Sequence, residues 1–141
     1  VDKAIEVCGL PKRKCVTKKF RIHGYRKNPD LTDHMYVYGS DEPKILRLIE
    51  QEPALGEKLS QKFGYTLAEV VWAVREEMAI TLEDVLARRV RMLFVDAREA
   101  MAAAPKAAAV MARELGRDQA WIDEQVKSFT DLAKNYIFEQ K

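Results

Sequence analysis

The hydrophobic pattern of the chain is strongest in the stretch TLAEVVWAVREEMAITLEDVLARRVRMLFVDA, from Thr66 to Ala97. Apolar residues recur there at spacings of three and four, the period of a helix with one buried face. Thr66 and Glu69 form a capping-box pattern, in which two side chains satisfy amides that the first turn leaves unpaired. The expected buried face of this helix comprises Leu67, Val70, Val71, Val74 and Met78.

A second helix is expected directly after the first. Thr81 is its N-cap candidate, and Glu83 and Asp84 favour the positive end of its dipole. Its predicted common face comprises Leu82, Val85, Leu86 and Arg89. Because the turn between the two helices is tight, they must pack on each other or on a shared third surface.

The flanking sequence predicts further helices. Ser40 is an N-cap candidate before Asp41, Glu42 and Pro43, residue types that suit a first turn. The expected buried side of that helix is Ile45, Leu46, Leu48 and Ile49, and a short segment with Leu55 and Leu59 runs from Pro53 to Gly64.

The C-terminal part predicts an alanine-rich helix capped by Asp96 and ended by Leu115 and Gly116. Pro105 lies inside it and predicts a kink or two abutting helices. Asp118 is expected to cap the last helix, whose apolar positions are Ile122, Val126, Phe129, Ala133 and Tyr136. The predicted fold is therefore all-α, an antiparallel bundle of about 5–7 helices.

The N-terminal part differs from this bundle. Residues 1–7 resemble the end of a helix whose beginning is missing, so the chain is expected to be a piece of a longer protein. Residues 12–30 form a basic connector in which Val16 to Ile22 alternate enough for one short strand, or for a merely extended segment. We expect residues 1–35 to be this truncated helix plus linker, and residues 36–141 to be the helical domain.

Composition restricts the classes of protein that the chain can belong to. The 141 residues are 48% hydrophobic and 33% charged, and they can bury a core without disulfides. No run approaches the roughly 20 apolar residues that span a bilayer. Cys8 and Cys15 are separated by six residues, within reach of a disulfide, but reduced thiols of minor structural role fit better.

Charge is distributed unevenly along the chain. Eight basic residues and no acidic residue lie between Val7 and Pro29, whereas the remainder holds 16 basic and 22 acidic residues. Phe20 and Tyr25 lie among these basic residues, a mixture that binds single-stranded nucleic acid or anionic lipid. A solvated connector crossing the surface of a larger, more acidic domain explains the segment more simply.

Candidate chemistry is sparse. Glu76 and Glu77 point about 100° apart on a helix, so a solvated face explains them better than a catalytic pair. An arginine cluster of Arg88, Arg89 and Arg91 could bind an anion, but ion pairs with Glu83 or Asp84 are the simpler interpretation. The remaining candidates are also explained without a functional role. Trp72 and Trp121 are expected to be apolar anchors, and His23 and His34 are isolated from each other and from the cysteines. Without a Gly-rich phosphate loop or a nucleophile motif, we expect no catalytic, cofactor-binding or metal-binding residue in this chain.

The central block resembles the C-terminal helical domain of FAD-dependent glycerol-3-phosphate dehydrogenases. The residues that carry this resemblance are Glu69-Val70, Trp72 to Arg75, Glu77, Ala79 and the unbroken run from Thr81 to Arg89, with Phe94 and Asp96-Ala97 beyond. Weaker similarity extends to Thr17, His23-Gly24, Tyr38 to Asp41, Glu114 to Gly116, Trp121, Gln125 and Phe129. The linker departs from the family at Phe20-Arg21-Ile22, where a run closer to Leu-Pro-Leu is common.

The resemblance implies that an intact parent uses FAD to oxidise sn-glycerol 3-phosphate to dihydroxyacetone phosphate and passes electrons to quinone. Such enzymes are cytoplasmic, peripheral on the membrane and often homo-oligomeric, and oxidases that use oxygen share the architecture. No active-site residue of the family maps onto this chain, whose implied role is to pack on the flavin domain. The alternative is an independent helical interaction module whose basic arm binds nucleic acid or an acidic partner.

Overall fold

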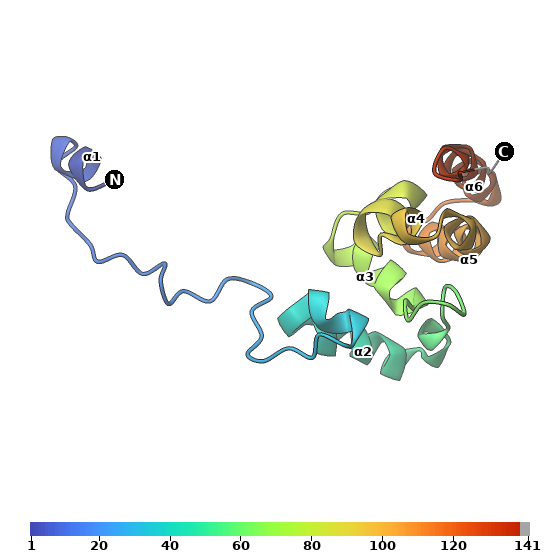
Figure 1. The fold of residues 1–141 in the computed structure, drawn as a ribbon, viewed down its shortest axis with the longest axis horizontal. Coiled ribbons are helices and arrows are strands. Elements are labelled where there is room, and N and C mark those ends of the chain that lie inside the picture. The colour runs from blue at the N-terminus through green and yellow to red at the C-terminus, as the bar shows by residue number, and fades with distance from the viewer. Residues whose placement is uncertain (139–141) are drawn as a thin grey trace.

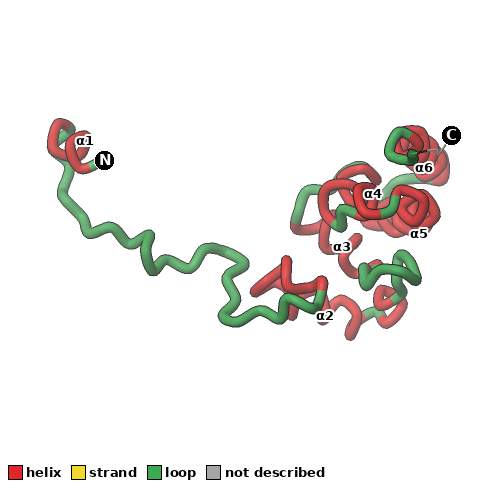
Figure 2. The backbone as a smooth tube through the Cα atoms, viewed as in Figure 1, coloured by secondary structure: helices red, strands yellow, loops and turns green. Residues whose placement is uncertain are grey.

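The computed structural model describes residues 1–138 of the chain, and these residues form helices joined by short loops and one long linker (Figures 1 and 2). The elements are α1 (Asp2–Val7), η1 (His34–Asp41), α2 (Glu42–Gln51), η2 (Pro53–Gly56), α3 (Leu67–Glu76), η3 (Asp84–Arg89), α4 (Met92–Val95), α5 (Ala97–Leu115) and α6 (Gln119–Lys134). η1 and η2 are 3-10 helices, and η3 is a π-helix. The predicted all-α class is confirmed. No strand forms within residues 1–138, where an isolated bridge joins Lys58 and Thr66.

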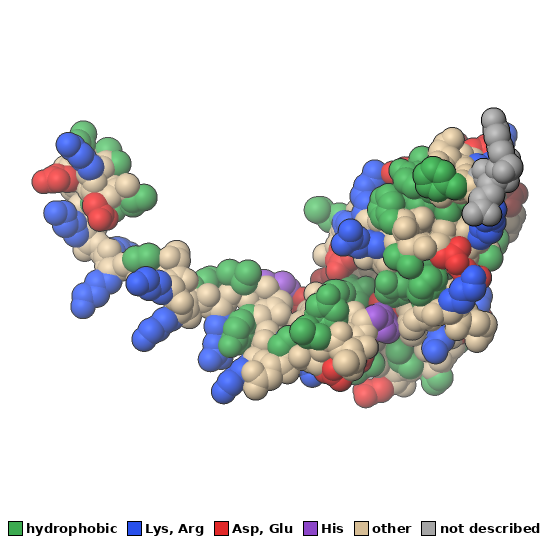
Figure 3. Space-filling view, viewed as in Figure 1, with side chains coloured by type: hydrophobic (Ala, Val, Ile, Leu, Met, Phe, Trp, Pro, Cys, Tyr) green, Lys and Arg blue, Asp and Glu red, His purple; other side chains and the backbone are tan. Residues whose placement is uncertain are grey.

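The N-terminal segment extends away from the helical body (Figure 1). No residue of α1 is buried, and Val16, Phe20 and Ile22 are all largely exposed. The prediction of a strand between Val16 and Ile22 is wrong, because a strand needs a hydrogen-bonded neighbour and none of residues 1–138 pairs with it. The segment is extended apart from a turn at residues 17–19, where the Lys19 amide donates to the Val16 carbonyl oxygen at 3.2 Å. Its basic side chains point outwards along it (Figure 3).

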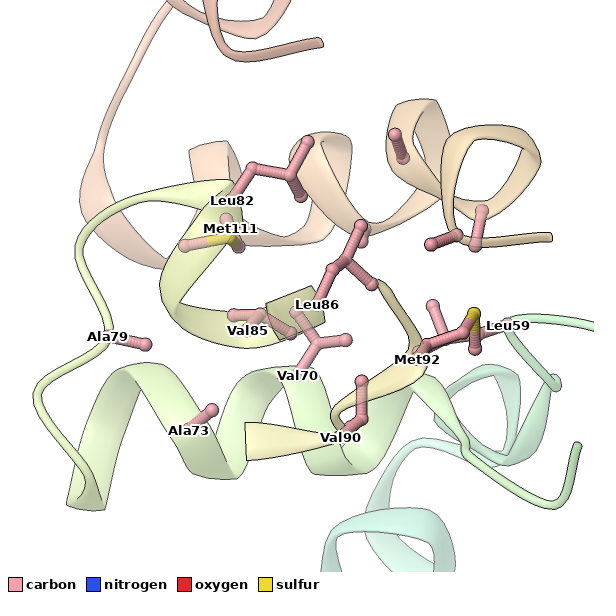
Figure 4. Close-up of a cluster of buried hydrophobic side chains, with 14 of the residues drawn as sticks. Leu59, Val70, Ala73, Ala79, Leu82, Val85, Leu86, Val90, Met92 and Met111 are labelled. Carbon is pink, nitrogen blue, oxygen red and sulfur yellow. The ribbon is translucent and has the colours of Figure 1, made fainter. Parts of the chain in front are cut away.

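The core lies between α3, η3 and α5 (Figure 4). Val70 and Val71 of α3 and Val85 and Leu86 of η3 are fully buried, as the helical pattern predicted. The facing side of α5 is built from small residues, which let the neighbouring helices approach closely: Ala100, Ala103, Ala104, Ala107 and Ala108. α6 packs along α5 after the short turn at Gly116, which has a left-handed φ of 64°.

Predicted helix starts are largely confirmed. The Glu69 side chain accepts from the Thr66 amide at 2.7 Å, and Asp96 and Asp118 accept from the amides of Glu99 and Trp121. Ser40 is not a cap, because η1 runs through it and α2 begins at Glu42 with Asp41 before it.

Pro105 does not divide α5 into two helices. α5 is one continuous helix from Ala97 to Leu115, and Pro105 lies on its exposed side. Water can reach that side, where it can solvate the carbonyl that the proline leaves without a donor. The expectation of two abutting helices is therefore wrong.

Three residues predicted to be apolar contacts lie outside the core. Leu46 is 44% exposed on α2, and Met78 is 85% exposed because α3 ends before it, at Glu76. Tyr136 lies beyond the end of α6 and is 45% exposed.

No helix of residues 1–138 is long and apolar enough to cross a membrane.

Candidate functional site: the junction of linker and bundle

A hollow in the described residues lies where the linker meets the bundle. Three segments line it: the linker, η1 with the start of α2, and the end of α3. The lining residues are His23, Gly24, Val37, Tyr38, Asp41, Lys44, Trp72, Glu76 and Glu77. The cavity measures about 360 Å³, at the lower end of the range for small-ligand sites.

Two glycines bring the linker against η1. The Ser40 amide donates to the Gly24 carbonyl oxygen at 3.3 Å. Gly39 has a left-handed φ of 53°, and a β-carbon on it would lie 1.8 Å from that same oxygen. Only glycine therefore permits this contact.

Charged groups hold the same junction. The side chain of Asp41 is nearly buried. Its Oδ2 lies 2.5 Å from His23 Nε2, and its Oδ1 lies 2.8 Å from Lys44 Nζ. The hydrogen bond from Lys44, together with that from His23, holds the pKa of the Asp41 carboxyl below its usual range. Arg26 forms an ion pair with Glu42 one residue further along.

A buried carboxylate lies behind this hollow. Glu69 is 1% exposed, and its oxygens accept from the Thr66 amide at 2.7 Å, the Tyr38 hydroxyl at 3.2 Å and His34 Nε2 at 3.1 Å. The hydrogen bond to Glu69 raises the pKa of His34, and burial followed by the negative charge of Glu69 raises the pKa of Tyr38. Each named polar atom already has a partner, so this network holds η1 on α3 and offers no free base.

The two neighbouring glutamates at the end of α3 differ. Glu76 is exposed, as the solvated-face interpretation predicted, but Glu77 is half-buried and lies 3.1 Å from Arg89 Nε. Burial raises the pKa of Glu77, against the opposing charge of Arg89. The prediction that both glutamates are solvated is therefore wrong for Glu77, whose carboxylate forms an ion pair with the Arg89 guanidinium.

Two arginines of the cluster, Arg88 and Arg89, form ion pairs. Arg88 lies 2.6 Å from Asp84 and 2.7 Å from Glu83, as predicted, and Arg89 also donates to the Glu77 carbonyl oxygen at 2.5 Å. Arg91 takes a left-handed φ of 57° before α4.

Other sequence-selected side chains are dispersed. Cys8 and Cys15 are free and exposed, and Trp72 is buried while Trp121 is half-buried. Among residues 1–138, no three His, Cys, Asp or Glu side chains gather as a metal site would require. His23 and His34 do have partners, Asp41 and Glu69, which lie 18 and 35 residues away in the sequence. Glycine at positions 24 and 39 is the feature of the sequence that could have indicated a close approach of two backbone segments here.

Acidic side chains of the chain itself lie at the starts of α3, α5 and α6. Glu69 accepts from the amide of the N-cap residue Thr66, and Asp96 and Asp118 accept from the amides of Glu99 and Trp121. Their negative charge makes these three helix ends less favourable for a phosphate group.

Comparison with known proteins identifies the chain's relatives. Residues 15–122 match the sequence model of the family described as the C-terminal domain of alpha-glycerophosphate oxidase. A probable mitochondrial glycerol-3-phosphate dehydrogenase of Dictyostelium discoideum is 28% identical over 138 residues, covering 97% of this chain and 21% of that protein. Glycerol-3-phosphate dehydrogenase 2 of Mycobacterium tuberculosis is 33% identical over 119 residues, covering 84% and 20%.

The human mitochondrial glycerol-3-phosphate dehydrogenase is 34% identical over 122 residues, covering 83% of this chain and 16% of that protein. No solved structure gives a significant match. The chain thus spans about a fifth of the length of its curated relatives. With the family model matched over most of its length, the chain belongs to the family of the C-terminal domain of alpha-glycerophosphate oxidase.

Proposed function

We propose that this chain is the C-terminal helical domain of an FAD-dependent glycerol-3-phosphate dehydrogenase. The intact enzyme would oxidise sn-glycerol 3-phosphate to dihydroxyacetone phosphate, passing the two electrons to a membrane quinone. The match of residues 15–122 to the family, together with relatives named glycerol-3-phosphate dehydrogenases, supports this proposal. The alternative, an independent module binding nucleic acid or an acidic partner, gains no support from these comparisons.

The described residues do not fit FAD. A flavin dinucleotide needs helix-terminal amides for its pyrophosphate, and the starts of α3, α5 and α6 each carry an acidic side chain, Glu69, Asp96 and Asp118, that already accepts from a backbone amide there. The hollow at the linker junction is lined by three carboxylates, which would repel phosphates. FAD and glycerol 3-phosphate are therefore assigned to another part of the parent.

The role of this domain is then to support the rest of the enzyme. We assign residues 1–35 to the end of a preceding helix and the linker, and residues 36–141 to the domain that packs on the flavin domain. The exposed α1 and the anchoring of His23 and Arg26 on the bundle support this division. Homo-oligomer formation and a peripheral site on the cytoplasmic membrane complete the proposal.

The test uses the full parent chain. Its visible spectrum is expected to show bound flavin, and glycerol 3-phosphate should reduce a quinone analogue, whereas the 141-residue chain alone should be colourless and inactive. A colourless, inactive parent would refute the proposal. Turnover that consumes oxygen and produces hydrogen peroxide, with no quinone reduction, would replace the dehydrogenase by an oxidase.

A further inference from the structure

Large apolar side chains are exposed around the hollow at the linker junction. Ile22, Val37 and Met78 are 73%, 65% and 85% exposed. Val37 lines the hollow, Ile22 precedes the lining residue His23, and Met78 follows the lining residue Glu77. The lining of the hollow, together with Ile22 and Met78, which adjoin it along the chain, is called here the junction face. Exposed apolar side chains beside a hollow are a feature of interaction surfaces.

The backbone holds Met78 outwards. Its φ is 56°, a left-handed conformation that a side chain such as methionine rarely adopts. The next residue, Ala79, is fully buried, and its amide donates to the Ala73 carbonyl oxygen at 2.9 Å. Because the chain must turn inwards at Ala79, Met78 is left projecting from the end of α3, 85% exposed among the described residues 1–138.

The polar part of the junction face is predominantly acidic. Asp41, Glu76 and Glu77 line the hollow with Lys44 and His23. Lys44 and His23 are bound to Asp41, and Glu77 is paired with Arg89. Within residues 1–138, Glu76 lies in no ion pair and is exposed at the rim. A covering surface that suits this face is apolar and carries a basic side chain opposite Glu76.

We propose that the junction face is covered by the part of the parent chain that precedes this one, and this inference rests on the proposed function. About four-fifths of the length of the relatives lies outside the matched segment. The linker leaves the bundle from this face, because His23 and Arg26 are held there by Asp41 and Glu42. The preceding domain is thereby tethered beside the junction face, at a high effective concentration.

The other exposed apolar group fits this role less well. Phe94 and Tyr136 already contact each other edge to face, with ring centroids 5.6 Å apart. They belong to α4 and to the segment after α6, which lie outside the lining of the junction hollow. Val95, 66% exposed at the end of α4, therefore serves as a control position on this second group.

The experiment measures thiol alkylation in the intact parent. Cys8 and Cys15 are replaced by serine, and either Met78→Cys or Val95→Cys is added. The alkylation rate of each thiol in the native parent is compared with its rate in denaturant. We expect Met78→Cys to be protected at least about tenfold, the equivalent of a contact worth about 1.4 kcal/mol, and Val95→Cys to react at nearly its denatured rate.

Several outcomes would overturn the inference. Equal, fast alkylation at both positions would show an uncovered junction face, and protection confined to Val95→Cys would place the contact on the second group. Protection of Met78→Cys that rises with protein concentration would assign the face to a second copy. Flavin content and turnover, measured on the same samples, separate the two proposals: an active parent with a reactive Met78→Cys thiol refutes the docking alone, whereas protection in a colourless parent refutes the enzyme assignment alone.

Discussion

A β-carbon on Gly39 would lie 1.8 Å from the carbonyl oxygen of Gly24, at the point where the linker meets η1. Gly39→Ala therefore either breaks this contact or distorts η1, in addition to the strain of a left-handed φ. We expect a loss of unfolding free energy of about 2–4 kcal/mol for the 141-residue chain, measured in urea.

Gly116→Ala is the matched control for that substitution. Gly116 has a φ of 64°, but a β-carbon on it would meet no atom within 4 Å, so only conformational strain of about 1–2 kcal/mol applies. Equal losses in the two variants would contradict a specific contact between Gly24 and Gly39.

The buried carboxylate of Glu69 gives a second prediction. Glu69→Gln replaces an acceptor of several hydrogen bonds by an amide whose NH₂ group cannot accept from Thr66, Tyr38 or His34. We expect a loss of about 2–4 kcal/mol in urea unfolding. Glu76→Gln, at the exposed C-terminal end of the same helix, should change stability by less than about 0.5 kcal/mol, and a loss there as large as that at Glu69 would remove the distinction.

Much of this fold follows from local sequence signals. Thr66 with Glu69, Asp96 and Asp118 mark helix starts because a cap needs residues only three apart, and the structure has all three caps. Periodicity found the buried faces of α3 and η3, because the apolar residues of a helix face are also only three or four positions apart. The periodicity was misleading at Met78. The spacing of apolar residues continues to this position, but the hydrogen-bonded helix has already ended at Glu76.

The junction could not be predicted from the sequence in the same way. Many of its contacts join residues distant in the sequence, such as His23 with Asp41, 18 positions apart, and His34 with Glu69, 35 positions apart, and no short spacing encodes them. The prediction for Glu77 failed because the burial of this residue depends on Arg89, brought back by the turn before η3. The π-helical geometry of η3 could not be predicted either, because the same spacing of apolar residues fits an α-helix equally well.

Helix capping gives a third prediction, on α5. Asp96 accepts from the Glu99 amide at 3.1 Å and also lies 3.0 Å from Lys62 Nζ, so cap and charge must be separated. Asp96→Ala removes both and should cost about 1 kcal/mol, whereas Asp96→Asn keeps the cap and should cost only a few tenths. A loss in Asp96→Asn as large as in Asp96→Ala would assign the effect to the ion pair.

The contact between His34 and Glu69 makes stability depend on pH. The pKa of His34 is raised above its ordinary value of 6.5 in the folded state, first by the hydrogen bond to Glu69. A raised pKa means that the folded chain holds the proton more tightly than the unfolded chain. The stabilisation is therefore complete below pH 6.5 and is lost as the pH rises through the folded-state pKa.

Urea unfolding of the wild-type chain and of His34→Gln across this range measures that loss. We expect the difference in unfolding free energy between them to shrink as the pH rises, because only the wild type loses a charged partner for Glu69. Tyr38→Phe is the control, because it removes another hydrogen-bond donor to Glu69. The Tyr38 hydroxyl keeps its proton throughout that pH range, since burial raises the pKa of Tyr38. A difference for His34→Gln that stays constant with pH would show that His34 contributes packing against Tyr65 and no charge.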